Sequence, residues 1–177
     1  MSALFGLTYA TYVGIVGASL VAFDGPAVTD AQKAQDEKLW VLTVGKNSPK
    51  KDTGAKDGIV SLEYRPQQEM WWRFKPLYAA GVSTDGIVYA TAAVRKDFQL
   101  GPIQITPHFG PTLYQSKIDQ RFSGSELIQF RTGFDILIPI TKEVSIGGGY
   151  YHISNGNLNR KTSAELDITN ISVQYKF

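Results

Sequence analysis

Three polar residues in the C-terminal third of the chain have the types needed for nucleophilic catalysis. His152 and Ser154 are separated by one residue, and Asp167 follows further along the chain. On a β-strand, alternate residues share a face, so the imidazole and the hydroxyl would lie about 6–7 Å apart at the backbone. A serine so placed can act as a nucleophile with the histidine as general base, provided that a third group orients the ring. The same residues also fit a rim where polar side chains simply meet water.

Two carboxylates compete for the role of the orienting acid. Counting back from Phe177, the odd-numbered positions are apolar at first, and the same face then carries Asp167 and Glu165. If this segment forms the strand next to His152, a carboxylate is available to the imidazole. From spacing alone, both acids remain candidates.

The elements that position these residues follow from a period of two in the hydrophobic pattern after residue 37, which is typical of strands with two differently solvated faces. The clearest example is 103–114, where apolar and polar residues alternate. Each alternating run is long enough for the roughly 9–11 residues that a tilted strand needs to cross a bilayer. The eight predicted strands are 38–46, 57–65, 70–83, 86–98, 102–115, 126–139, 143–154 and 165–177.

The charged residues decide which face points inward. Glu63, Arg95, Arg131 and Asp135 lie on the faces opposite the apolar residues. A soluble barrel of the lipocalin type would expose a nearly continuous apolar surface to water, far larger than monomers tolerate. The pattern therefore predicts an all-β fold, an eight-stranded antiparallel transmembrane β-barrel of the outer-membrane type. Side chains fill the interior of so small a barrel, so we expect no open pore.

The connections give the barrel a direction. Long loops are predicted near 47–56, 116–125 and 155–164 and a short one near 83–86, with short turns near 66–69, 99–101 and 140–142. Outer-membrane barrels have long outer loops and short inner turns, which places His152 and Ser154 near the outer rim. An aromatic girdle is predicted at the inner rim, formed by Tyr64, Trp71, Trp72 and Tyr175.

The N-terminal segment has no charged residue up to Phe23. We interpret 1–27 as a signal peptide, 28–37 as a polar lead-in and 38–177 as the barrel. The missing positive charge before the apolar run leaves open a retained helix, as a membrane anchor or in the core.

The composition excludes several function classes. A net charge of +2 does not suggest a nucleic-acid partner. The absence of cysteine excludes disulfides and cysteine-based metal or redox sites. No group of residues has metal-ligand spacing, so neither a metal nor another cofactor is predicted. We interpret His108 as a hydrogen-bonded interior residue, and the run 147–149 of three glycines as a sign of close packing or curvature.

The run His152-Ile153-Ser154-Asn155 resembles the H-x-S-N motif of the lipid A 3-O-deacylase (PagL-type) family. The resemblance implies an outer-membrane esterase that removes an ester-linked acyl chain from lipid A of lipopolysaccharide, at the 3-O position. It implies that Ser154 is the nucleophile, that His152 is the base and that Asn155, with the backbone of Gly156, stabilises the oxyanion. Family members often continue with Ala-Gly after the asparagine, whereas Gly156-Asn157 follows here.

The family's acid is a glutamate that opens the last strand. Alignment from the C-terminus places Asp167 there, while counting from the serine comes closer to Glu165. We favour Asp167, because its distance to the chain end and the alternation after it match better. Hydrophobic residues below the site would lie along the acyl chains: Ile146, Tyr150, Ile171 and Val173.

The resemblance also implies partners and a location. The chain is expected in the bacterial outer membrane, with lipopolysaccharide as substrate and membrane lipids around it. Its end on Tyr175-Lys176-Phe177 resembles the recognition signal for the barrel-assembly machinery, and a homodimer is left open. Basic loop residues are candidates for lipid A phosphates, or for ordinary solvated charge: Lys46, Lys50, Lys51, Lys56, Arg160 and Lys161. The alternative from another class is a non-enzymatic structural or adhesive barrel.

Overall fold

The computed structural model describes residues 37–47, 58–116, 128–155 and 166–177. The predicted signal peptide and nearly all of the lead-in lie outside these ranges. No helix among the described residues is long and apolar enough to span a membrane. The strands are β1 (Lys38–Asn47), β2 (Gly58–Pro66), β3 (Lys75–Ser83), β4 (Ile87–Arg95), β5 (Phe98–Leu100), β6 (Ile103–Ser116), β7 (Ile128–Pro139), β8 (Val144–Ser154) and β9 (Leu166–Lys176).

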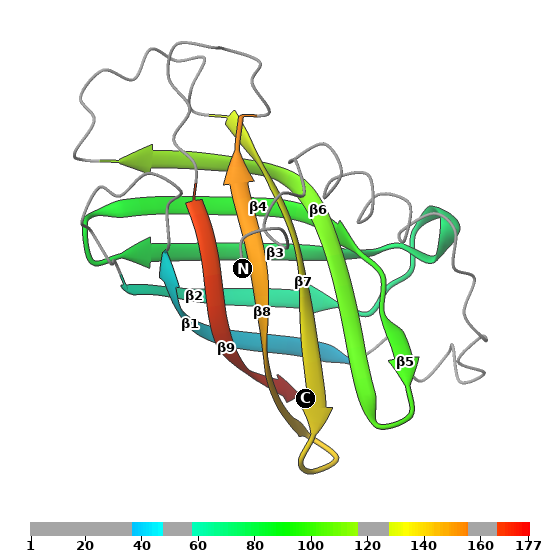
Figure 1. Cartoon of the computed structure of the whole chain (residues 1–177). Helices are drawn as coiled ribbons and strands as arrows, with labels where there is room; N and C mark the ends of the chain where they lie inside the picture. The colour runs from blue at the N-terminus through cyan, green and yellow to red at the C-terminus, as the bar shows by residue number, and fades with distance from the viewer. Residues whose placement is uncertain (1–36, 48–57, 117–127, 156–165) are drawn as a thin grey trace, which may run out of the picture.

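All neighbouring strands are antiparallel, and the sheet closes on itself. The strand order is β4-β3-β2-β1-β9-β8-β7-β6-β5, and an additional pairing of β4 with β6 completes the ring. The first and last strands of the chain are therefore neighbours, with Leu42 opposite Val173. Figure 1 shows β6 to β9 on one side of the barrel and β2 to β4 on the other. The predicted eight-stranded barrel is confirmed, because β5 only extends the edge of β6 at one end.

Two strand predictions are wrong at the same end of the barrel. The third strand begins at Lys75, not at residue 70, because Trp71–Arg73 form a 3-10 turn in which Trp72 and Arg73 have positive φ angles of 54° and 60°. The fourth strand ends at Arg95, and residues up to 98 do not continue it. We call this end, which carries Lys38, Arg95 and Phe177, the inner end, and the end at Ser154 the outer end.

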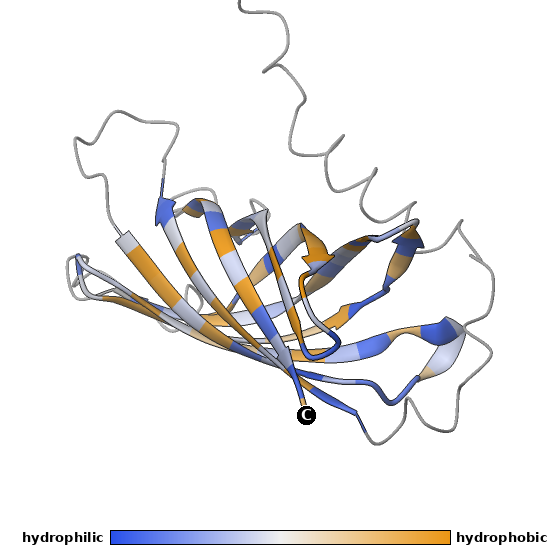
Figure 2. Ribbon diagram, turned by 90° about the horizontal axis from the view of Figure 1, so that it is seen from below, coloured by the Kyte–Doolittle hydropathy of each residue, from blue (hydrophilic) through white to orange (hydrophobic). Residues whose placement is uncertain are grey.

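Alternation divides every strand between an apolar coat and the interior. Figure 2 shows hydrophobic and hydrophilic residues following one another along the strands. On β1 the outward side chains of Trp40, Leu42 and Val44 are exposed, whereas Val41 and Thr43 between them are buried. The coat gives lipid the apolar contact that the bilayer interior requires.

Aromatic residues gather near the inner end, as predicted. The rings of Trp40 and Tyr64 lie 5.1 Å apart, and those of Tyr175 and Phe177 5.0 Å apart. Trp71 is the most exposed aromatic side chain of the described residues, at 82%. This is the arrangement of an interfacial girdle, where an aromatic ring meets both hydrocarbon and headgroup.

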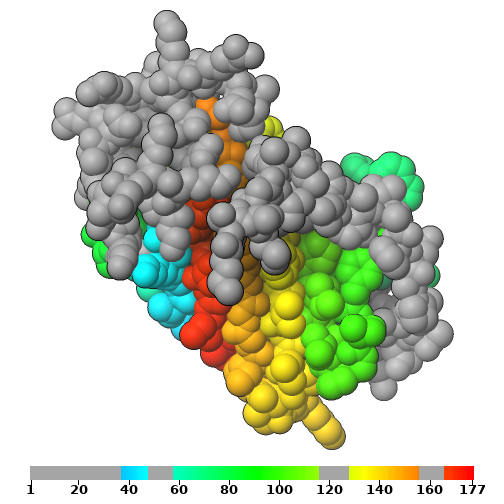
Figure 3. All heavy atoms as spheres, in the orientation of Figure 1, coloured from blue at the N-terminus to red at the C-terminus, as the bar shows by residue number. Residues whose placement is uncertain are grey.

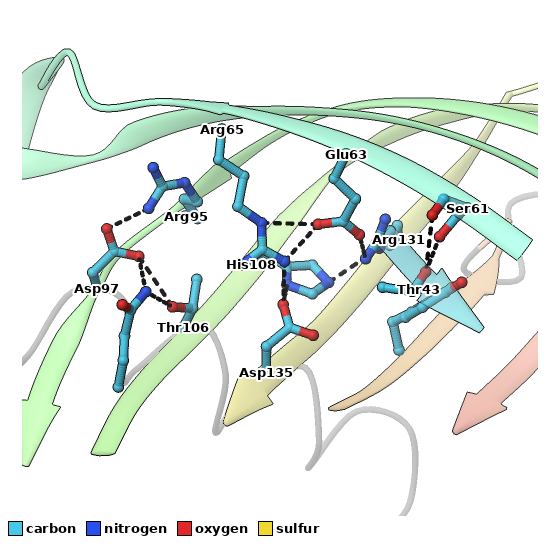
Figure 4. A network of polar contacts seen from close by, with 12 residues as sticks. Thr43, Ser61, Glu63, Arg65, Arg95, Asp97, Thr106, His108, Arg131 and Asp135 are labelled. Atoms are coloured by element: carbon cyan, nitrogen blue, oxygen red, sulfur yellow. Dashed lines mark hydrogen bonds and ion pairs between the residues drawn. The ribbon is translucent and has the colours of Figure 1, made fainter. Parts of the chain in front are cut away.

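A network of charges fills the interior (Figure 4). Glu63 accepts hydrogen bonds from Arg65 Nε at 2.9 Å and from Arg131 Nη2 at 2.6 Å. Arg65 Nη2 also contacts Asp135 Oδ2 at 2.5 Å, and Arg131 Nε donates to His108 Nε2 at 3.1 Å. These five side chains are buried inside the barrel, so the predictions of an interior ion-pair network and a hydrogen-bonded His108 are confirmed.

Towards the outer end the interior becomes aromatic and aliphatic. Tyr151 points inward from β8 and shares a hydrogen bond of 2.8 Å with the hydroxyl of Tyr89. The guanidinium of Arg131 lies 3.9 Å from the ring centroid of Tyr151, a cation–π contact. Through Tyr151, the inward face of β8 therefore contacts the charged network, which lies nearer the inner end.

The glycines of β8 allow its neighbours to approach closely. A Cβ atom on Gly147 would collide with the carbonyl oxygen of Ile136 on β7, and one on Gly148 would lie 2.6 Å from the carbonyl oxygen of Asn170 on β9. The predicted role of these glycines in close packing is confirmed. The backbone contacts keep β8 close against both neighbours at mid-height.

We predict that Glu63→Gln destabilises the barrel by about 3–5 kcal/mol, because two buried guanidiniums lose their shared negative charge. The free energy of unfolding would be measured by urea titration in lipid vesicles. Glu69→Gln, at an exposed carboxylate of the inner turn, is the matched control. A value for Glu63→Gln within about 0.5 kcal/mol of the control would contradict the structural role of the network.

Candidate active site

The register between β8 and β9 brings the predicted histidine and the favoured acid together. His152 is directly opposite Asp167 in the antiparallel pairing. Both belong to the outward alternation, as Ile146 on β8 and Ile171 on β9 do at 46% and 73% exposure. Directly opposite residues have Cβ atoms about 4.5–5.5 Å apart, which suits a short carboxylate. The predicted spacing and face are therefore found in the structure.

The two side chains form a hydrogen bond. His152 Nδ1 lies 2.8 Å from Asp167 Oδ1. Since an ionised carboxylate only accepts, this contact requires the proton on Nδ1 when the imidazole is neutral. The lone pair is then on Nε2, where a general base needs it. This is the relationship between base and acid that the sequence predicts for His152 and Asp167.

Among the described residues, two further groups hold Asp167. The hydroxyl of Tyr150 donates to the same oxygen, Oδ1, that contacts the imidazole. The backbone N–H of Asp167 donates to Asn47 Oδ1 at 3.1 Å, across from β9 to the end of β1. The aspartate is thus fixed through its backbone by one neighbouring strand and through its carboxylate by the other.

Ser154 and Asn155 lie at the outer end of β8. Ser154 is the last residue of the strand, and both side chains are buried. No hydrogen bond joins Ser154 Oγ to His152 in the described part of the chain. Catalytic contacts of this kind are often long without substrate, so the position remains suitable for a nucleophile. The predicted oxyanion partner Gly156 and the alternative acid Glu165 lie outside the described residues.

The site interrupts the apolar coat where three strands meet. Figure 3 shows the outer surfaces of β9, β8 and β7 side by side. Below the site, Ile146, Ile171 and Val173 are exposed, as predicted for a surface that contacts acyl chains. His152 and Asp167 themselves are only 5% and 7% exposed. Among the described residues, no three histidine, aspartate or glutamate side chains group as a metal site would require.

Two residues beside the imidazole were not predicted as part of the site. Thr132 on β7 is directly opposite His152, and its buried hydroxyl has no hydrogen-bond partner in the described chain. It is the polar residue in an outward series that is otherwise Ile128, Phe130, Phe134, Ile136 and Ile138. That interruption was a usable signal. Tyr150 was predicted only as an acyl-chain contact, because its hydroxyl has no signature in a hydrophobic pattern.

Comparison with known proteins agrees with the fold and with the family resemblance. The family model of lipid A 3-O-deacylase (PagL) matches residues 51–176. No curated protein matches the chain.

Solved outer-membrane structures share the fold at low identity. The outer membrane enzyme PagL is 13% identical with a TM-score of 0.52, covering 76% of this chain and 98% of that one. Neisserial surface protein A is 15% identical with a TM-score of 0.54, covering 80% and 96%. Ail, the attachment invasion locus protein of Yersinia pestis, is 11% identical with a TM-score of 0.50, covering 80% and 97%.

The structural neighbours carry the barrel fold, and the family match covers most of the chain, including both strands of the site. The chain is an outer-membrane β-barrel and belongs to the lipid A 3-O-deacylase family.

Proposed function

We propose that this protein is an outer-membrane esterase that removes the acyl chain esterified at the 3-O position of lipid A. Ser154 is the nucleophile, His152 the general base and Asp167 the acid that orients it. The observation that carries the proposal is the hydrogen bond of 2.8 Å between His152 Nδ1 and Asp167 Oδ1. His152 lies two residues before Ser154, and both belong to the run that resembles the motif of the family. A bare fold similarity would not require this contact.

The reaction divides into two steps. Ser154 Oγ bonds to the ester carbonyl carbon while His152 Nε2 accepts the hydroxyl proton, giving a tetrahedral oxyanion. Collapse of this intermediate breaks the bond to the sugar oxygen, which takes the proton back from His152. Water, deprotonated by His152, then attacks the acyl-serine, and the products are the free fatty acid and the restored serine. Asp167 remains ionised and stabilises the imidazolium in both steps.

The place of the site on the barrel suits an ester at the boundary between sugar and hydrocarbon. The pair faces outward near the outer rim, so lipid A can reach it without leaving the membrane plane. The exposed residues Ile146, Ile171 and Val173 below it offer an apolar surface to the acyl chain.

We expect Ser154→Ala and His152→Ala to lower the deacylation rate by at least about 10³-fold, since each removes a member of a unit that acts together. Lipid A from cells expressing each variant would be examined by mass spectrometry for loss of one hydroxyacyl group. Ser145→Ala, at the other end of β8, is the control.

A wild-type protein that leaves lipid A unchanged, both in cells and in detergent, would reject the esterase and favour the non-enzymatic barrel. Full activity of Ser154→Ala would reject only the nucleophile.

Asp167→Asn is expected to lower kcat by about 10²–10⁴-fold, because the amide can favour the wrong imidazole tautomer. Glu165→Gln is expected to retain more than half of the activity. The rates would be compared with lipid A in mixed micelles, after heat-modified gel migration has shown that both variants are folded. If Glu165→Gln is the slower variant, the acid that orients His152 is Glu165 and not Asp167.

For Asn155→Ala we expect a decrease in kcat of about 10²–10³-fold, the usual effect of removing one oxyanion donor. KM should change little, because the donor binds charge that develops only in the transition state. Steady-state kinetics on the same micelles would test this. A change confined to KM would instead assign Asn155 to ground-state binding.

A further inference from the structure

Among the described residues, Tyr150 makes a contact with the site to which the proposed mechanism gives no role. It lies on β8 two residues before His152, on the same outward face, and is directly opposite Thr169. Asp167 is therefore its diagonal neighbour, a separation that a tyrosine side chain can span. The Tyr150 hydroxyl donates to Asp167 Oδ1, the oxygen that also contacts His152 Nδ1.

We infer that Tyr150 is a positioning residue that holds the Asp167 carboxylate against His152 during catalysis. The inference rests on the proposed esterase function and adds a fourth side chain to it. Tyr150 contacts neither the reacting atoms nor Ser154 in this role. It acts through Asp167.

The geometry of Asp167 calls for a positioning group. An aspartate on a strand has one methylene fewer than the glutamate typical of the family and so reaches less far. Its backbone is fixed towards β1 by Asn47, but rotation about its side-chain bonds would still take Oδ1 away from the imidazole. A hydroxyl donor from β8, the strand of His152, favours the rotamer in which Oδ1 faces the histidine.

The charge of Asp167 also favours a hydrogen-bond donor beside it. Asp167 is 7% exposed and belongs to an apolar outward surface, where an ionised carboxylate is costly unless hydrogen bonds compensate it. A tyrosine hydroxyl stabilises the anion more than the neutral acid, because it donates a charge-assisted hydrogen bond. It thereby offsets part of the cost of burying the charged carboxylate beside His152.

The test is Tyr150→Phe, which removes only the hydroxyl and keeps the ring in the coat. We expect kcat to fall by about tenfold or more, with KM for lipid A in mixed micelles within about twofold of the wild type. Tyr78→Phe, at a half-exposed outward tyrosine on β3, is the matched control and should retain wild-type kcat.

A double-mutant cycle separates positioning from a general structural effect. If Tyr150 acts through Asp167, Tyr150→Phe should slow an Asp167→Asn protein by less than about twofold. Equal factors in both backgrounds would overturn the inference. So would a kcat of Tyr150→Phe close to that of the wild type, or a loss found in KM alone.

The outcome is distinct from failure of the proposed function. Wild-type enzyme that deacylates lipid A and loses this activity in Ser154→Ala supports the esterase whatever Tyr150→Phe does. If the wild type leaves lipid A unchanged in cells and in detergent, the esterase assignment itself fails, and with it the inference about Tyr150. Full activity of Ser154→Ala would reject the nucleophile alone.

Discussion

The hydrogen-bonding needs of the backbone in hydrocarbon constrain everything else in this molecule. A strand in lipid has no water to satisfy its N–H and C=O groups, so a sheet can exist there only if its last strand pairs with its first. Here the pairing of β4 with β6 and of β1 with β9 completes that ring. Once the ring is closed the registers are fixed, and each side chain is assigned to the coat or to the interior. The meeting of His152 with Asp167 is one product of that register.

The two faces of β8 serve different purposes because of the same alternation. Tyr151 points inward and is fixed by Tyr89 and Arg131, while His152 and Tyr150 point outward and contact Asp167. The rigid interior therefore supports the wall on which the site is built. Precise placement of a base and its acid depends on such support, because small displacements are costly in rate.

The barrel is predictable from the sequence because apolar and polar residues alternate along each strand with a period of two. Strand boundaries agree closely wherever alternation is uninterrupted, as in β6 and β8. They disagree at Trp71–Arg73, where aromatic and basic residues alternate as in a strand while the backbone takes positive φ angles to turn at the inner rim. A hydropathy pattern carries no information on φ.

The candidate site was also predictable only in part from the sequence. His152, Ser154 and the outward placement of Asp167 followed from parity along single strands. The contact of Tyr150 with Asp167 depends on the register between β8 and β9, and no single strand encodes it. Thr132 is intermediate, because its parity is visible in the sequence while its position opposite His152 is not.

The buried charges inside the barrel bear on how lipids reach and leave the candidate site. Glu63, Arg65 and Arg131 lie buried inside the described barrel, whereas His152 and Asp167 belong to its outward alternation, so in the proposed reaction lipid A and the released fatty acid meet the site from the membrane. In that proposed reaction, substrate arrival and product departure are both two-dimensional diffusion in the leaflet that contains lipid A. Under the same proposal, the detached chain remains beside the protein as a membrane component, so turnover would change the composition of the lipid that surrounds it.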